Sequence, residues 1–466
     1  MTSAQTVPQP TRPGPQTRLT VPVPLVSLRV RRFLATEAGS AAILLVATAA
    51  ALVWANLPTV SYERFWATEA SVRIGGWSIA MDLRHWVNDA AMVIFFLVVG
   101  LEINREVSVG SLRSRRAVII PVFGAIGGLA MPALIYFALN HGGPGANGWG
   151  IAMSTDTAFL IGILALFGPR CPDQLRLFLL TLAIVDDLGA ITVLALFYTD
   201  HVSVPALAVA ILLVAGLFVL RWARVWQLTA YVAIGLALWA AIFASGLHPT
   251  LAGVLIGLLV PAAMPEPGQR EQFRLYGRAV IEAPDPQRVR LASSAAKATV
   301  PASDRLQDVL HPVSAFAVVP LFGLANAGVR LDGAALGQAL RSPVTIGVVI
   351  ALVAGNAVGI SAATAIALRA GLGDLPGNVR YGHLIGGAIL AGIGFTISLF
   401  VTDLAFGEQG LRQQAQIGVL AGSALAAVLG SLALRYLGER LPLCTIADAP
   451  ELPALPAGPW RDPSLR

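Results

Sequence analysis

The sequence predicts an all-α polytopic membrane protein with about 12 transmembrane helices, and three observations indicate this class. Hydrophobic residues make up 56% of the 466 residues and charged residues only 12%, whereas soluble domains average about 25% charged residues. Apolar segments of bilayer-crossing length recur along the chain, and arginine clusters occupy every second connection between them. This composition excludes a soluble enzyme, a disordered chain and a disulfide-stapled secreted module, since there are two cysteines.

Twelve segments approach the roughly 20 apolar residues needed to cross a bilayer. They are expected near residues 35–57, 85–104, 117–139, 149–168, 175–198, 203–220, 226–245, 248–263, 311–328, 343–368, 382–403 and 413–437. We therefore treat residues 34–440 as one membrane domain.

The two ends and one internal connection are polar. Residues 1–33 are proline-rich and predict a disordered tail, as do residues 441–466. Residues 264–310 predict a long polar loop that contains Lys297, the only lysine in the chain. The arginine clusters place this loop and both termini in the cytoplasm. Because these arginines form short clusters and no continuous stripe, we expect no nucleic-acid partner.

Residues 70–84 form an unusual connection on the opposite side. Apolar and polar residues alternate on either side of Gly75 and Gly76, which is typical of a β-hairpin with a two-residue turn. An irregular external loop fits the pattern equally well.

Three aspartates lie deep inside the predicted spans, where a carboxylate costs at least about 2.5–3.5 kcal/mol. Asp156 lies in the fourth span, and Asp186 and Asp187 lie in the middle of the fifth. A polar cluster that only holds helices together is the alternative, but such clusters normally use Ser, Thr, Asn or Gln. The adjacent acids therefore indicate a functional site.

The chemistry of the pair follows from burial. Each acid can hold a proton or supply oxygen ligands to a hard cation such as Na⁺. Consecutive helix residues point about 100° apart, so Asp186 and Asp187 can differ in role. A site that cannot hold both ions together exchanges one for the other, which predicts cation/proton antiport with no enzyme chemistry and no cofactor. The only metal expected at Asp186 and Asp187 is the transported ion.

Two further patterns have alternative explanations. The stretch from Gly392 to Ser398, including Thr396, predicts an unwound segment, with Thr155 and Asp156 at a matching break; close helix packing explains the glycines equally well. Glu102 and Glu106, one turn apart, could form a cytoplasmic entrance for cations or a solvated helix end.

The function also has alternatives. Another cation-coupled transporter of similar build is one. An intramembrane aspartyl protease is the other, since residues 371–374 read Gly-Leu-Gly-Asp and residues 453–456 read Pro-Ala-Leu-Pro. Both short motifs lie in polar regions, and no Tyr–Asp pair supplies the second acid.

Seven strings of residues, taken in order, resemble the NhaA-type sodium/proton antiporter family over residues 34–440. They are WVNDA (86–90), FFLVVGLE (95–102), STD followed by AF (154–159), AIVDDLGAI (183–191), GLHPTLAGV (246–254), FGLANAGV (322–329) and GIGFT (392–396).

The resemblance implies inverted repeats and two broken helices that cross at mid-membrane, with Thr155 and Asp156 at the crossing. It also implies that Asp186 and Asp187 carry Na⁺ (or Li⁺) and protons, Asp187 being the more direct ligand, for pH and sodium homeostasis. Glu102 and Glu106 would belong to the entrance and the pH response. The hairpin near 70–84 would join two copies into a homodimer in the lipid bilayer, which would be a bacterial inner membrane.

Asn356 is a departure from the family, whose pattern has a lysine there that pairs with the first aspartate. Asparagine can donate hydrogen bonds but carries no charge, and no predicted span contains a lysine. If both acids ionise on sodium binding, two protons exchange for one sodium. If Asp186 keeps its proton, the exchange is one for one and electroneutral.

Overall fold

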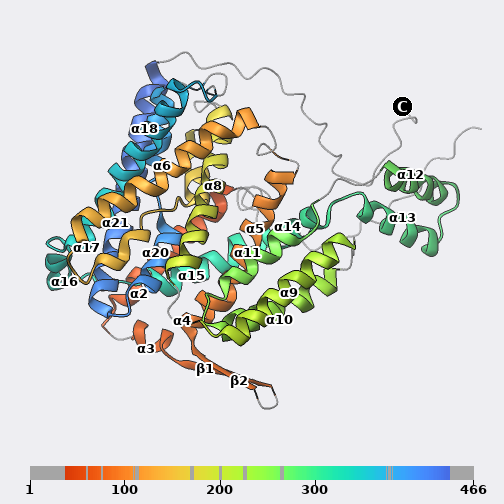
Figure 1. Cartoon of the computed structure of the whole chain (residues 1–466), viewed down its shortest axis with the longest axis horizontal. Coiled ribbons are helices and arrows are strands. Elements are labelled where there is room, and N and C mark those ends of the chain that lie inside the picture. The colour runs from red at the N-terminus through yellow and green to blue at the C-terminus, as the bar shows by residue number, and fades with distance from the viewer. Residues whose placement is uncertain are drawn as a thin grey trace, which may run out of the picture.

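The computed structural model describes residues 37–58, 61–74, 77–108, 110, 115–167, 173–198, 202–223, 228–262, 267–373, 375, 379 and 381–440. Both predicted tails, the Gly75–Gly76 turn and Asp374 lie outside these residues. The described chain is a helical bundle with one small hairpin that projects from one end (Figure 1).

The first half of the chain begins with a helix, a hairpin and the helices that lead to the first break. In chain order the elements are α2 (Glu37–Ala55), α3 (Tyr62–Trp66), β1 (Glu69–Ile74), β2 (Trp77–Asp82), α4 (Leu83–His85), the π-helical turn η1 (Trp86–Ala91), α5 (Met92–Ser108), α6 (Arg115–Asn140), the 3₁₀ turn η3 (Ala146–Gly150), α7 (Thr157–Phe167), α8 (Asp173–Phe197), α9 (Val204–Trp222), α10 (Leu228–Ser245) and α11 (Thr250–Leu259).

The second half contains two polar helices followed by further membrane helices. These are α12 (Pro267–Glu282), α13 (Pro286–Ala298), α14 (Ala302–Val313), η5 (Ser314–Val318), α15 (Val319–Asn326), α16 (Gly333–Ala339), α17 (Pro343–Ile350), η6 (Ala351–Gly355), α18 (Asn356–Arg369), α19 (Tyr381–Leu390), α20 (Phe395–Ala405) and α21 (Gln409–Arg440). The long loop expected at 264–310 thus contains α12 and α13 and the start of α14.

Each of the twelve predicted apolar segments coincides with a helix or a run of helices. In the part of the chain that the structure describes, seven are long and apolar enough to cross a membrane, and α19 with α20, bent by 45°, makes an eighth. Three shorter apolar helices occur at Gly39–Ala55, Thr229–Ser245 and Thr250–Leu259. A multi-pass helical membrane protein is therefore confirmed, while the count of twelve stays a prediction.

The hairpin is confirmed. Strand β1 pairs antiparallel with β2, with Glu69 opposite Asp82 and Val72 opposite Ile79. It projects beyond the helices, and we call this end of the molecule the hairpin side (Figure 1). The opposite end, where α5 finishes at Ser108, is called the arginine side.

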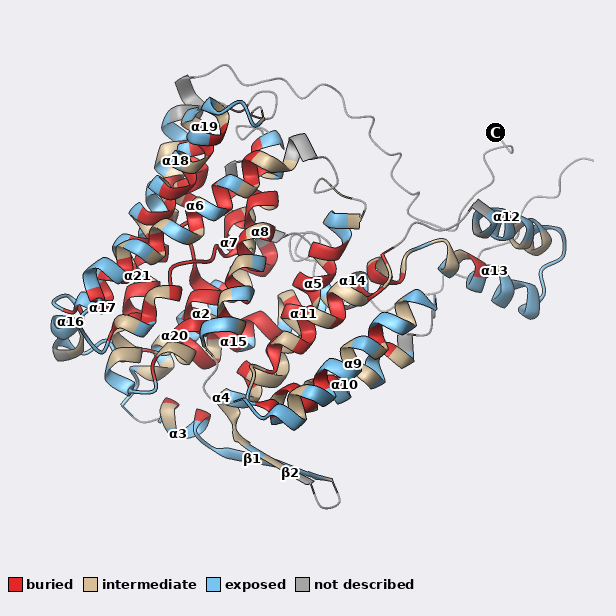
Figure 2. Cartoon of the chain, in the orientation of Figure 1, coloured by how far each residue is buried: buried red, intermediate tan, exposed pale blue. Residues whose placement is uncertain are grey.

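The helices divide into two groups (Figure 1). In the first group, α5 packs on α11, and these two helices share a separate hydrophobic core with α9, α10 and α14. We call this group the α5–α11 bundle. In the other, α6 packs on α18, with α8, α17, α19 and α21 around them; we call it the α6–α18 bundle. Buried residues concentrate where α7 and α20 run inside the second bundle (Figure 2).

Glycines bring the helix backbones into contact within each bundle. A side chain at Gly100 would collide with the backbone of Val254, and one at Gly257 with the backbone of Leu97. In the other bundle, Gly127 and Gly359 stand in the same way against each other's backbone. Small residues permit this close helix approach in membrane proteins.

Candidate cation and proton site

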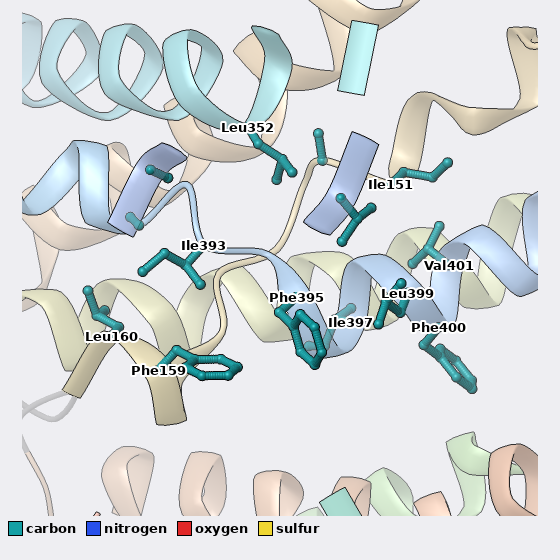
Figure 3. Packing of buried hydrophobic residues seen from close by; sticks show 14 of the residues in the cluster. Ile151, Phe159, Leu160, Leu352, Ile393, Phe395, Ile397, Leu399, Phe400 and Val401 are labelled. Carbon is teal, nitrogen blue, oxygen red and sulfur yellow. The ribbon is translucent and has the colours of Figure 1, made fainter. Parts of the chain in front are cut away.

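Two unwound segments cross inside the molecule, one before α7 and one before α20 (Figure 3). The Asp156 N–H donates to the Ile393 carbonyl over 2.5 Å, and the Thr155 hydroxyl donates to the Ala391 carbonyl over 2.8 Å. Each segment therefore satisfies polar backbone groups of the other. This is the condition under which non-helical backbone is tolerated at membrane depth.

Glycine is required at this crossing because the backbones touch. A side chain at Gly392 would collide with the carbonyl of Leu352, and one at Gly394 would come within 2.9 Å of the carbonyl oxygen of Ser154. The unwound stretch predicted from the glycine-rich sequence is therefore present, and close backbone approach is the physical reason for its glycines.

Asp156 joins the N-terminal ends of both half-helices. Its carboxylate accepts the Phe159 N–H of α7 over 3.2 Å and the Thr396 N–H of α20 over 3.0 Å. The Thr396 hydroxyl donates to the same carboxylate. Helix N-termini carry partial positive charge, so one acid placed between two of them offsets both. Phe159 and Phe395 pack edge to face beside it, with ring centroids 5.3 Å apart.

Asp186 and Asp187 are both buried on α8 but have different surroundings. One oxygen of Asp186 accepts the Thr155 N–H over 2.9 Å, and the other accepts no hydrogen bond from any residue that the structure describes. Asp187 accepts the Ser154 hydroxyl over 3.1 Å. The 100° between consecutive helix residues thus directs the two acids to different partners on one crossing segment.

A cavity of about 120 Å³ reaches this site and is lined by Asp187 and Asp156. Thr155 and Thr396 also contribute to its wall, but Asp186 does not. Toward the arginine side its lining includes Glu102 of α5 and His311 of α14. The cavity is large enough for a few water molecules or a hydrated ion.

The two glutamates singled out in the sequence lie in different positions relative to the cavity. Glu102 lines the cavity, whereas Glu106, one turn further toward the arginine side, is not among its lining residues. Glu106 is therefore placed outside the site itself.

Asn356 is fully buried at the start of α18. Its amide N–H donates to the carbonyls of Ala152, over 3.4 Å, and Leu352, over 3.2 Å. Its side-chain oxygen accepts no hydrogen bond from the described part of the chain. Asn356 therefore contacts the same unwound segment as Asp186, since Ala152 and Thr155 are three residues apart, but it brings no charge.

On the hairpin side of the aspartates, polar side chains from four elements contact one another. Asn88 of η1 and Asn326 of α15 exchange hydrogen bonds over 2.8 and 3.3 Å. Asn88 also donates to Asp403 of α20 over 2.9 Å. Asp403, whose side chain is only 10% exposed, pairs with Arg412 of α21 over 2.9 Å. We call these four residues the polar layer.

An aromatic layer lies between the polar layer and the aspartates. Phe400 of α20 packs against Phe96 of α5, with centroids 5.5 Å apart, and against Phe322 of α15 at 6.3 Å. All three rings are buried. Asp403 follows Thr396 by seven residues, or about 10 Å along a helix, so both layers lie within a short distance of the crossing.

Four residues near the site were not singled out by the sequence patterns: Ser154, His311, Asp403 and Arg412. Asp403 had a usable signal, because it is a carboxyl group within the eleventh apolar segment. For Ser154 the only signal was its place beside Thr155 and Asp156.

The family described as "Na+/H+ antiporter 1" matches residues 31–434. A relative from Frankia alni named "Na(+)/H(+) antiporter NhaA 3" is 62% identical over 460 residues, which covers 98% of this chain and 99% of the relative.

More distant matches carry similar names. "Na(+)/H(+) antiporter NhaA 1" of Mycolicibacterium vanbaalenii is 44% identical over 396 residues, which covers 85% of this chain and 64% of that longer relative. A solved structure, described as that of "the sodium proton antiporter MjNhaP1 from Methanocaldococcus jannaschii at pH 8", covers 89% of this chain with a TM-score of 0.49 and 12% identity.

Proposed function

Since this chain belongs to the Na⁺/H⁺ antiporter 1 family and exchanges sodium for protons, we propose that Asp187 binds the transported cation and Asp186 binds a proton. The protein would export Na⁺, and Li⁺ as a similar hard cation, from a bacterial cytoplasm. The positive-inside bias supports placing the arginine side and both termini in the cytoplasm.

The observation that carries this assignment is the unequal access of the two acids. Asp187 lines the cavity, where a cation can arrive together with water, while Asp186 lies behind it. Carboxylate and hydroxyl oxygens are suitable ligands for a hard cation, and Asp187, Ser154 and Thr155 supply them within one site. Asp156 keeps the crossing in place by holding both half-helices.

Glu102 has a supporting role in this proposal. Its carboxyl group lines the cavity between Asp187 and the arginine side, so it attracts cations toward the site. Glu106, which stands outside the cavity lining, would act at most through the field at the entrance and in the pH response.

Exchange requires access from one side at a time. The cavity extends toward the arginine side, and the polar and aromatic layers close the hairpin side. We expect the α5–α11 and α6–α18 bundles to move relative to each other, which opens these layers and closes the cavity.

The uncharged Asn356 supports one-for-one exchange. A buried carboxylate without a cation beside it is costly, and Asn356 offers Asp186 none, because its amide is bound to backbone carbonyls. Asp186 then keeps its proton throughout the cycle, and a single charge at Asp187 alternates between sodium and a proton.

The site assignment is tested by sodium-dependent proton release from purified protein in proteoliposomes. Asp187→Asn is expected to abolish release, whereas Asp332→Asn, which replaces an exposed carboxyl group that caps α16 outside the cavity, should retain exchange. Full exchange by Asp187→Asn would contradict the carboxylate mechanism.

Stoichiometry needs a separate measurement, in which sodium uptake is followed at equal pH under an imposed membrane potential. The potential supplies about 2.3 kcal/mol per net charge per 100 mV, so an electroneutral exchanger should not accumulate sodium. Asn356→Lys is the comparison variant, and it should show potential-driven uptake. Accumulation by the unmodified protein would overturn the one-for-one assignment.

The hairpin is proposed as the dimer contact. In this two-stranded sheet, each strand has one edge without a partner strand among the described residues. Such an edge can pair with the hairpin of a second copy. Deletion of residues 70–81 should convert dimers to monomers in cross-linking, with sodium-dependent proton release retained.

A further inference from the structure

Helices α12 and α13 form a polar hairpin that stands apart from the membrane bundles. They pack against each other and extend beyond the ends of α9 and α10 (Figure 1). Asp285 caps α13 by accepting the Gln287 N–H over 3.1 Å. Arg288 donates to the Ala279 carbonyl of α12 over 3.2 Å, which holds the two helices together.

The exposed surface of this pair is basic. Between residues 267 and 298 there are six basic and three acidic side chains, for a net charge of +3. Arg270, Arg274 and Arg278 recur every four residues and so lie along one side of α12. All three are exposed, and none forms an ion pair or side-chain hydrogen bond with any residue that the structure describes.

Apolar side chains lie beside these arginines and are also exposed. Ile281 is 82% exposed and Leu275 64% exposed, and Phe273 is exposed as well. By helix geometry Ile281 falls between Arg270 and Arg274 around α12. Such large apolar groups in water, next to cations, are typical of segments that lie in a membrane interface.

A short connection keeps one end of the pair close to the bilayer. Residues 299–301 alone separate α13 from α14, which begins a candidate membrane span at Ala302. Four extended steps cover at most about 14 Å. The pair is therefore tethered within reach of the headgroups, on the side where the arginine bias places the cytoplasm.

From this combination we infer that α12 and α13 form a docking surface for anionic phospholipid headgroups of the membrane that holds the protein. The arginines of α12 contact the phosphate groups, and Phe273 and Ile281 enter the boundary between headgroups and acyl chains. Lipid is favoured over a soluble partner because the surface is tethered at a membrane and its positive charge complements an anionic leaflet. This inference does not depend on the roles proposed for the aspartates.

The test places an environment-sensitive dye on single cysteines in the full chain, with Cys171 and Cys444 replaced by serine. Ile281→Cys reports the basic side of α12, and Gln272→Cys, on the opposite side of the helix, is the matched control. The protein is reconstituted either in phosphatidylcholine alone or with added phosphatidylglycerol, and iodide, present on both faces, quenches the dye.

The dye at position 281 should be protected from iodide in vesicles that contain phosphatidylglycerol and quenched in pure phosphatidylcholine, while the dye at 272 is quenched in both. Protection should fall in about 1 M salt, where the Debye length is about 3 Å. Equal quenching of position 281 in both lipids, or equal protection in both, would overturn the inference.

A second comparison separates charge from fold. Replacing the three arginines together (Arg270→Gln, Arg274→Gln, Arg278→Gln) should remove the protection at position 281, and the three lysine replacements should keep it. Retained protection in the glutamine variant would show that the arginines do not bind the lipid. Sodium-dependent proton release, measured in parallel, confirms that each variant is folded.

Discussion

The two ends of the path that leads to Asp187 are built differently. Toward the arginine side the path is a cavity with Glu102 and His311 in its wall. Toward the hairpin side, within about 10 Å along α20, two layers of side chains include contacts between the two bundles. The site thus borders a cavity toward the arginine side, whereas a small number of specific contacts lie toward the hairpin side, which we call the outer end.

The hydrogen bonds at the outer end are weak enough to let this end open in the proposed exchange cycle. Hydrogen bonds contribute about 0.5–1.5 kcal/mol each in net terms, and those to charged groups about 1.5–3. A few such bonds can be exchanged for water without unfolding either bundle, and a ligand that favours the other arrangement can shift the balance.

The largest effect is expected from locking the outer end. Asn88→Cys with Asp403→Cys joins η1 to α20, and a short thiol cross-linker should then abolish exchange, with recovery on reduction. Ser342→Cys with Gln414→Cys is the matched control, because these side chains contact each other at 2.6 Å within the α6–α18 bundle. Cross-linked control protein should still exchange, and normal exchange by the locked Asn88/Asp403 pair would contradict the role of the outer layers.

A second large effect is expected from removing the central ring of the aromatic layer. Phe400→Ala leaves a cavity, and such truncations cost about 3–5 kcal/mol in buried cores. A cysteine at Ser398 should then react with a membrane-impermeant reagent added from outside. Phe178→Ala, a truncation of equal size in α8, should leave Ser398→Cys unreactive, and equal reactivity in both backgrounds would count against a specific closure.

An intermediate effect is expected at the ion pair of the polar layer. Asp403→Asn or Arg412→Gln should each destabilise the closed outer end by about 1.5–3 kcal/mol, which corresponds to roughly a tenfold shift or more in apparent affinity for external sodium. The exchanged pair, Asp403→Arg with Arg412→Asp, should recover part of this loss. Independent, additive effects of the single changes would exclude a direct interaction.

The smallest effect is expected at Tyr62, beside the outer end on α3. Its hydroxyl donates to the Leu324 carbonyl over 2.8 Å, so Tyr62→Phe should cost about 1 kcal/mol without altering exchange. Burial raises the pKa of Tyr62 to about 12. A raised pKa stabilises the folded state fully below the unfolded value of about 10, and this contribution is lost as the pH rises toward 12. The Tm difference between the two proteins should therefore shrink above pH 10.

Much of the fold and the centre of the site were predictable because polar and charged residues are costly inside a membrane span. Apolar runs revealed the helices, and the cost of a buried carboxylate singled out Asp156, Asp186 and Asp187. The glycines at 392 and 394 indicated the second unwound segment.

Other features depend on packing and were not predictable. Which of two adjacent acids faces the cavity is decided by the rotation of α8 against the crossing segment, which the spacing of residues leaves open. The contact of Asn88 with Asp403 joins residues 315 positions apart, and only tertiary structure brings them together. The helices α12 and α13 within residues 264–310 are polar, so hydropathy alone predicted a loop there.

The glycine contacts inside the two bundles have a consequence for how the molecule divides into moving parts. Where Gly100 and Gly257 or Gly127 and Gly359 stand against bare backbone, no side chain can rotate to accommodate sliding, so each helix pair behaves as one rigid piece. The layers at the outer end are made of side chains, which can change partners. The positions of the glycines thus distinguish the helix pairs that stay together from the layers that can separate. Replacing Gly257 with alanine would test this distinction, because the added methyl group would force α5 and α11 apart.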